Sequence, residues 1–164
     1  MTWNETLHPR DPAGRSTGGR FVSLRSKIET NSAAMSEGDL RDRVLEPDGG
    51  FTYETSTGKE PRWGFSVSTR PDLSEPFEPK TFSYKQIKDY YVRNIAVLSE
   101  KGNYIGAWHN PKTGQGFLDV SRVVGSAAEA ERLSKRHDQI SYFVLHEGHS
   151  VTVNEKAKSG GIAQ

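Results

Sequence analysis

The apolar residues of this chain are spaced differently in its first third and in the remainder, and this difference limits what the chain can fold into. Up to about Glu46 they stand isolated among Gly, Ser, Arg and Asp, without a sustained period. Such a segment cannot bury enough surface to offset an ordering entropy of about 1–2 kcal/mol per residue. After Gly50 they alternate or recur every three to four residues, as strands and helices require. We therefore expect an N-terminal arm over residues 1–48, flexible or ordered by a partner, a folded domain over 49–154 and a disordered tail over 155–164.

Alternating runs separated by turn residues predict three β-hairpins in the folded region. The expected strand pairs are 51–55 with 63–67, 104–109 with 117–124, and 140–145 with 151–153. The second pair has the strongest turn chemistry, Asn110-Pro111-Lys112-Thr113-Gly114. Residues 70–80 contain three prolines and are expected to form a surface loop, because proline removes a ladder donor.

Two segments carry helix signals. Ser83 with Gln86 forms a capping-box pattern at the start of an apolar stripe that runs to Leu98. Tyr84 and Tyr91 belong to that stripe, whereas Tyr90 falls beside it and is expected to be partly exposed. A second helix is expected after Ser126, and a short one within the arm over residues 36–44.

Helices with one apolar stripe each need only one surface to cover. The expected fold is therefore α+β, a mostly antiparallel sheet of β-hairpins with two helices on one face. The expected element order is ββαββαββ, preceded by the extended arm.

Composition narrows the classes of function. With 22 Lys+Arg against 21 Asp+Glu, there is no net field to favour non-specific binding of nucleic acid or anionic membrane. The absence of cysteine excludes disulfides and cysteine-ligated metal sites. No apolar run reaches the roughly 20 residues of a membrane helix, and the N-terminus lacks the pattern of a signal peptide. We expect synthesis in the cytoplasm, no membrane partner and no cofactor.

One constellation in the second hairpin suggests a pocket. Trp108 and His109 lie at the end of one strand, and Asp119 and Arg122 lie on its partner. Indole, imidazole and carboxylate groups would then converge. The simpler interpretation is that Trp108 packs on the sheet as in any hairpin.

His146-Glu147-Gly148-His149 invites comparison with zinc motifs. Its histidines are three residues apart in an expected turn, rather than four apart on a helix as in H-E-x-x-H. We therefore expect no metal site there.

The arm contains a segment, residues 8–21, that no core requires. Its prolines stiffen it, its glycines permit close approach of the backbone, and its arginines and Phe21 offer anchors. These features suit a short motif that docks on another protein, although a solvated linker has a similar composition. The candidate partner-binding residues are His8, Arg10, Asp11, Arg15, Arg20 and Phe21.

Read as H-P-R-D followed by G-R-F, this segment resembles one that recurs in head-region proteins of actinobacteriophages, including portal-like and minor-capsid-like proteins. Residues 102–124 are similar to small domains of the same phages, for which no catalytic residues are known. The resemblance implies a non-enzymatic, virion-associated protein, a minor capsid or capsid-decorating head accessory protein. Its arm would bind a larger head protein, either capsid or portal.

Two other functions remain open from the sequence. One is a phage-encoded enzyme or host-directed effector with a site around the Trp108-His109 hairpin. The other is nucleic-acid binding, which the near-neutral charge disfavours.

Overall fold

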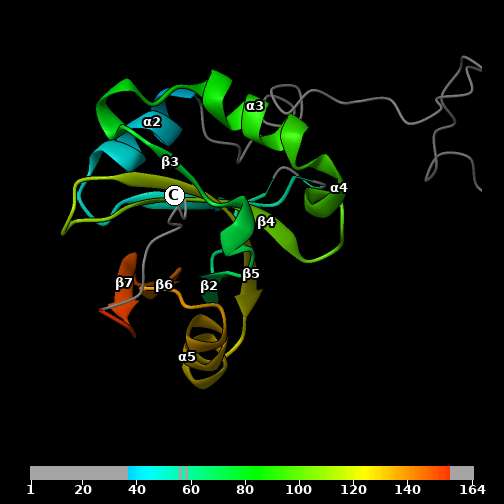
Figure 1. The fold of residues 1–164 in the computed structure, drawn as a ribbon, viewed down its shortest axis with the longest axis vertical. Coiled ribbons are helices and arrows are strands. Elements are labelled where there is room, and N and C mark those ends of the chain that lie inside the picture. Colours follow the sequence, from blue (N-terminus) through cyan, green and yellow to red (C-terminus); the bar gives the residue numbers. More distant parts are fainter. Residues whose placement is uncertain (1–36, 56, 58, 156–164) are drawn as a thin grey trace, which may run out of the picture.

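The computed structural model describes residues 37–55, 57 and 59–155, which form one antiparallel sheet with helices packed against it (Figure 1). The elements are α2 (Glu37–Leu45), β1 (Gly50–Tyr53), β2 (Phe65–Ser68), η2 (Pro71–Leu73), β3 (Glu75–Phe77), η3 (Pro79–Thr81), α3 (Tyr84–Arg93), α4 (Ile95–Leu98), β4 (Asn103–His109), β5 (Gly116–Val124), α5 (Ala127–Arg136), β6 (Ser141–Val144) and β7 (His149–Thr152). The fold is α+β, as the sequence predicts.

The sheet is organised around β5. In the described part of the chain the strand order is β1-β4-β5-β2-β6-β7, with β3 joined to β5 beside this path. Along one edge β5 pairs with β4, and along the other with β3 and then β2. In the β4–β5 register Gly106 is opposite Asp119 and Trp108 is opposite Phe117. The second and third hairpins are therefore confirmed, as β4–β5 and β6–β7.

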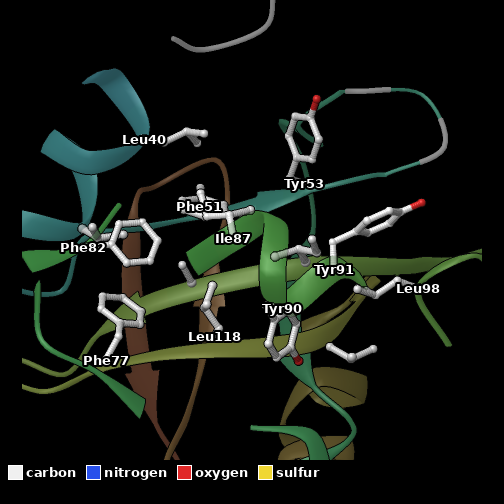
Figure 2. Close-up of a cluster of buried hydrophobic side chains, with 14 residues drawn as sticks. Leu40, Phe51, Tyr53, Phe77, Phe82, Ile87, Tyr90, Tyr91, Leu98 and Leu118 are labelled. Atoms are coloured by element: carbon white, nitrogen blue, oxygen red, sulfur yellow. The ribbon is translucent and has the colours of Figure 1, made fainter. Parts of the chain in front are cut away.

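The larger core lies between one face of β1, β4 and β5 and the helices α2, α3 and α4 (Figure 2). Alternate positions along each strand supply it, such as Phe51 and Tyr53 from β1 and Leu118 and Val120 from β5. Ile87, Tyr90 and Leu98 project from the helices onto this face. Period-2 strands and period-3.6 helices thus bury one face each, which is the arrangement expected for this fold class.

A smaller core lies beneath α5. Val67, Tyr142 and Val144 from β2 and β6 pack with Ala130 of α5, and Val124 lies against them. Val124 is an even number of residues from Leu118 and Val120 of the larger core, so all three lie on the same face of β5. The described helices α3 and α5 therefore cover the same face of the sheet, as predicted.

Local signals explain where the helices begin and end. Ser83 and Gln86 form the reciprocal capping box, with the Ser83 backbone N–H donating to Gln86 Oε1 at 2.8 Å. The Ser126 hydroxyl accepts from the Glu129 backbone N–H at 3.3 Å and starts α5. The stripe that the sequence extends to Leu98 is interrupted at Asn94, whose side-chain amide donates to the Tyr90 carbonyl. A polar side chain that bonds the backbone in this way competes with regular helix.

The expected first hairpin is wrong. β1 pairs with β4, and β2 pairs with β5 and β6, so the two strands are not neighbours in the sheet. The described part of the connection between them contains an isolated bridge, between Glu54 and Lys59. Phe51 and Tyr53 belong to the larger core while Phe65 and Val67 lie under α5, so each strand faces its own layer of helix.

Three smaller expectations also change. The proline-rich loop contains β3, whose Pro76 is an edge-strand residue opposite Phe117. The helix that the sequence assigns to the arm packs on the domain, because Leu40 and Val44 are buried in the larger core. The folded unit therefore includes α2 rather than beginning at residue 49. Tyr90 is fully buried instead of partly exposed, and its hydroxyl donates to the Leu73 carbonyl at 3.0 Å.

Tyr53 makes a pH-dependent contribution that can be measured. Its side chain is only 4% exposed, and its hydroxyl finds no hydrogen-bond partner among the described residues. Burial, and secondly the charge of Glu60, raises the pKa of Tyr53 to about 12 from 10.0. The neutral phenol is therefore favoured in the folded state, and the associated stability is complete below pH 10 and lost as the pH rises towards 12.

For Tyr53→Phe we expect unchanged stability at neutral pH, or a gain of up to about 1 kcal/mol from removing an unsatisfied hydroxyl. Between pH 10 and 12 the variant should lose about 2–3 kcal/mol less than the wild type. Burial also raises the pKa values of Tyr90 and Tyr104, so part of the alkaline loss should remain. Urea unfolding across this pH range measures the difference, and parallel curves for the two proteins would contradict the assignment.

Candidate functional site

The face of the sheet opposite the helices is built from small and polar residues. On β2 Ser66 and Ser68 alternate with Phe65 and Val67, and on β5 Asp119 and Ser121 alternate with buried leucine and valine. The same face holds Thr52 on β1 and Gly106 on β4. A Cβ at Gly106 would lie 2.5 Å from the Ser121 hydroxyl oxygen, so this face is too crowded there for a larger residue.

This face encloses a pocket of about 70 Å³. Five aromatic residues contribute to its lining. Phe51 and Tyr142 have their side chains in the cores on the other face, whereas Trp108 on β4, Phe117 on β5 and Phe143 on β6 lie on the pocket face. The hydroxyl-bearing residues along its wall are Thr52, Ser66, Ser68, Ser74, Ser121, Ser141 and Ser150. A pocket with aromatic walls and converging polar groups is the usual form of a small-ligand site.

Asp119 supplies the carboxylate of the pocket. The Ser68 hydroxyl donates to its Oδ1 at 3.2 Å, and Ser74 also hydrogen-bonds to its side chain. Burial raises the pKa of Asp119 above the usual value for an aspartate, and the two serine bonds partly oppose this effect. None of the ion pairs formed within the described residues involves this carboxylate.

Asp48 closes the sheet around the pocket. Its Oδ1 accepts from Trp108 Nε1 on β4, and its Oδ2 accepts from the Ser150 backbone N–H on β7, both at 2.8 Å. β7 is the last strand in the sheet order and β4 is the second, so one carboxylate joins two strands that three others separate. We call these two bonds the Asp48 bridge. Asp48 has φ of 63°, a left-handed conformation that aspartate tolerates better than most residues.

A second side-chain contact, between β1 and β2, lies on the same inner face of the sheet. The Thr52 hydroxyl donates to the Ser66 hydroxyl at 3.0 Å, although β4 and β5 separate their strands in the sheet order. The sheet is therefore curled strongly enough for side chains of β1 and β2 to meet across its inner face. Curvature, rather than any one loop, creates the pocket.

The structure brings together only half of the constellation suggested by the sequence. Trp108 and Asp119 line the same pocket. Arg122 has the opposite parity on β5, and its Nε donates to Asn103 Oδ1 at 3.1 Å. His109 is not among the residues lining the pocket, and its Nδ1 is buried without a hydrogen-bond partner in the described part of the chain.

The other histidine cluster lies in the β6–β7 turn. His146 Nε2 and His149 Nε2 are 3.6 and 3.4 Å from the Glu147 carboxylate. Across residues 37–55, 57 and 59–155, no group of three or more His, Cys, Asp or Glu side chains is arranged to hold a metal ion. Among the same residues no helix is both long enough and apolar enough to cross a membrane.

Most residues of the pocket carry no distinctive signal in the sequence. Ser66, Ser68, Ser121, Ser141 and Ser150 fall on alternate strand positions and resemble an ordinary solvent-facing side of an antiparallel sheet. The signal that was present is the combination of hydroxyl and glycine residues on that side of strand after strand, without a Lys or Glu. Asp48, at the end of the expected arm, carries no sequence signal that links it to this pocket.

The arm residues His8, Arg10, Asp11, Arg15, Arg20 and Phe21 lie outside the described residues. Comparisons of the chain with protein-family models, with curated proteins and with solved structures gave no match.

Proposed function

We propose that the protein is a non-enzymatic accessory protein of a bacteriophage virion, either a minor capsid or a capsid-decorating protein. Its arm would bind a larger head protein, capsid or portal, after synthesis in the host cytoplasm. The observation that carries the proposal is the segment from His8 to Phe21, whose prolines, glycines and arginines suit a docking motif.

The geometry of the domain is compatible with such an attachment. The chain before Glu37 joins the domain at α2, which packs on the helix-covered face through Leu40 and Val44. The pocket lies on the opposite face of the sheet. The start of α2 and the pocket therefore lie on different faces of the sheet.

The test is copurification with phage particles. The wild-type protein should be detected in purified virions by mass spectrometry. Replacing Arg10, Arg20 and Phe21 together by alanine should lower its abundance in particles at least tenfold, because the arginine forks and the aromatic anchor would be lost. The variant should unfold in urea at the same midpoint as the wild type.

A matched control is available within the arm. Arg25, Lys27 and Ile28 supply two cations and one apolar residue outside the motif. Their simultaneous replacement by alanine should leave abundance in particles within twofold of wild type. Absence of the wild-type protein from purified particles, or equal loss in both triple variants, would rule out the proposed docking motif.

A second candidate function uses the folded domain. A phage-encoded enzyme or host-directed effector acting at the Trp108-His109 hairpin is supported by the shared pocket of Trp108 and Asp119. The position of His109 outside that pocket argues against an imidazole as its acid or base. If Asp119→Ala left every infection phenotype unchanged, this second function would be rejected.

A further inference from the structure

The pocket has an electrostatic asymmetry that restricts what it can bind. Asp119 is its carboxylate, and no Lys, Arg or His is among the described residues that line it. An anionic ligand would meet this carboxylate without a compensating charge. Asp119 is half-buried, and an anion held partly away from water is costly to leave unpaired. A cationic ligand would supply the charge that the described lining does not offer.

The two serine bonds do not saturate Asp119. An ionised carboxylate has about four acceptor positions, and Ser68 and Ser74 occupy two of them. Acceptor capacity therefore remains on a group that lines the pocket. The oxygens of Ser66 and Ser121 lie along the same wall and can also accept hydrogen bonds.

The aromatic wall complements this acceptor set. Trp108, Phe117 and Phe143 line the pocket from three different strands. Ring faces attract cations, most strongly that of tryptophan, and the attraction increases where water is excluded. Trp108 is held in place because its Nε1–H donates to Asp48, so its ring is a fixed element of the wall.

The size of the pocket limits the bound group. A volume of about 70 Å³ corresponds to roughly five to seven water-sized positions, at about 10–15 Å³ for each. That space suits a guanidinium or short alkylammonium group rather than a whole nucleotide or sugar.

We propose that the concave pocket binds an organic cation, with its N–H groups donating to Asp119 and the surrounding hydroxyls and its charge against Trp108, Phe117 and Phe143. The cation is a guanidinium or alkylammonium head group, either on a free small molecule or on a protein side chain. This inference rests on the pocket alone and does not depend on attachment of the arm to a virion.

The test is NMR titration of the full-length protein with methylguanidine and with methylurea, its neutral counterpart of similar shape. Methylguanidine should shift the Trp108 indole N–H signal saturably, with a dissociation constant on the order of 1 mM for so small a probe. Methylurea and acetate should bind at least tenfold more weakly. Trp108→Phe assigns the indole signal among the three tryptophans of the chain.

Asp119→Asn removes the charge while keeping the shape, and it should weaken methylguanidine binding at least tenfold. Asp89→Asn makes the same change on α3, where Asp89 pairs with Lys85, and it should bind like the wild type. Acetyl-arginine amide separates the two sources of the cation: tighter binding than methylguanidine indicates a protein side chain, and weaker binding a free small molecule.

Equal affinity for methylguanidine and methylurea in the wild type, or no binding of either, would overturn the proposal without reference to any variant. Undiminished binding to a folded Asp119→Asn protein would overturn the role of the carboxylate. Neither result bears on copurification with virions, so the two proposals fail independently.

Discussion

Replacing Asp48 by alanine should cost the domain about 3–4 kcal/mol of unfolding free energy. The change removes the acceptor of two N–H groups, one from Trp108 and one from Ser150. Hydrogen bonds to charged groups contribute about 1.5–3 kcal/mol each, towards the lower end where water has access. Alanine also tolerates the positive φ of this position poorly, which adds about 1 kcal/mol.

A substitution series separates these contributions. Asp48→Gly loses both bonds but accepts the backbone conformation, so it should cost about 2–3 kcal/mol. Asp48→Asn keeps one good acceptor and a residue type that adopts positive φ, so it should cost about 1–2 kcal/mol. The difference between the alanine and glycine variants gives the backbone strain of alanine less the extra entropy of glycine in the unfolded chain. Urea unfolding gives the three values, and the Trp108 indole N–H signal in NMR, assigned with Trp108→Phe, reports whether the indole loses its partner.

Asp138 is the matched control, because it also has a positive φ, of 51°, and accepts from Asn154 Nδ2 near the surface. The Asp138 side chain does not join distant strands, so Asp138→Gly should cost less than about 1 kcal/mol of unfolding free energy. If the Asp48 and Asp138 variants were equally stable, the Asp48 bridge would not be what holds β7 near β4.

Local patterns predicted the elements of this fold well, because each depends on neighbours in sequence. The capping residues Ser83 and Ser126 place the starts of both helices correctly. The turn at Asn110 is tight because the Gly114 N–H donates to the Asn110 carbonyl, so the β4–β5 hairpin follows from its own sequence. These signals require no knowledge of the rest of the chain.

Strand pairing could not be predicted in the same way. Alternation at Phe51 and Tyr53 shows that one face of β1 is buried, but it does not say which strand lies beside it. The partner, β4, is about fifty residues away and is selected by the shared core beneath α3. The connection from Tyr53 to Phe65 is short enough for a hairpin. However, Phe65 and Val67 of β2 pack in the smaller core with α5, away from β1.

The pocket could not be predicted either, because it also depends on strand register. Two of the expected residues, Trp108 and Asp119, share a face because they occupy alternate positions on paired strands. His109 and Arg122 have the opposite parity, which the register fixes and the sequence does not reveal. The serines become a cavity wall only when the sheet curls, and the Asp48 bridge that accompanies the curl joins residues 102 positions apart.

Gly50→Ala should be among the most damaging single substitutions in the domain, with a loss of at least about 3 kcal/mol. A Cβ at this position would lie 2.0 Å from the Ala107 carbonyl oxygen and 3.1 Å from the Trp108 Cα. Both atoms belong to the backbone of β4, so no side-chain rotation can relieve the contact. β1 would have to move away from β4, and Asp48 lies two residues before Gly50, so the Asp48 bridge would be disturbed as well.

Gly125 provides the control, because a Cβ there meets no atom within 4 Å and its φ is not in the left-handed region. Gly125→Ala should change stability by less than about 1 kcal/mol, in the stabilising direction, since alanine restricts the unfolded chain. Urea midpoints at equal m-values measure both variants. A Gly50→Ala protein as stable as Gly125→Ala would mean that β1 does not pair with β4 in this register, and the inner face of the sheet, the pocket and its closure by Asp48 would then all need a different strand order.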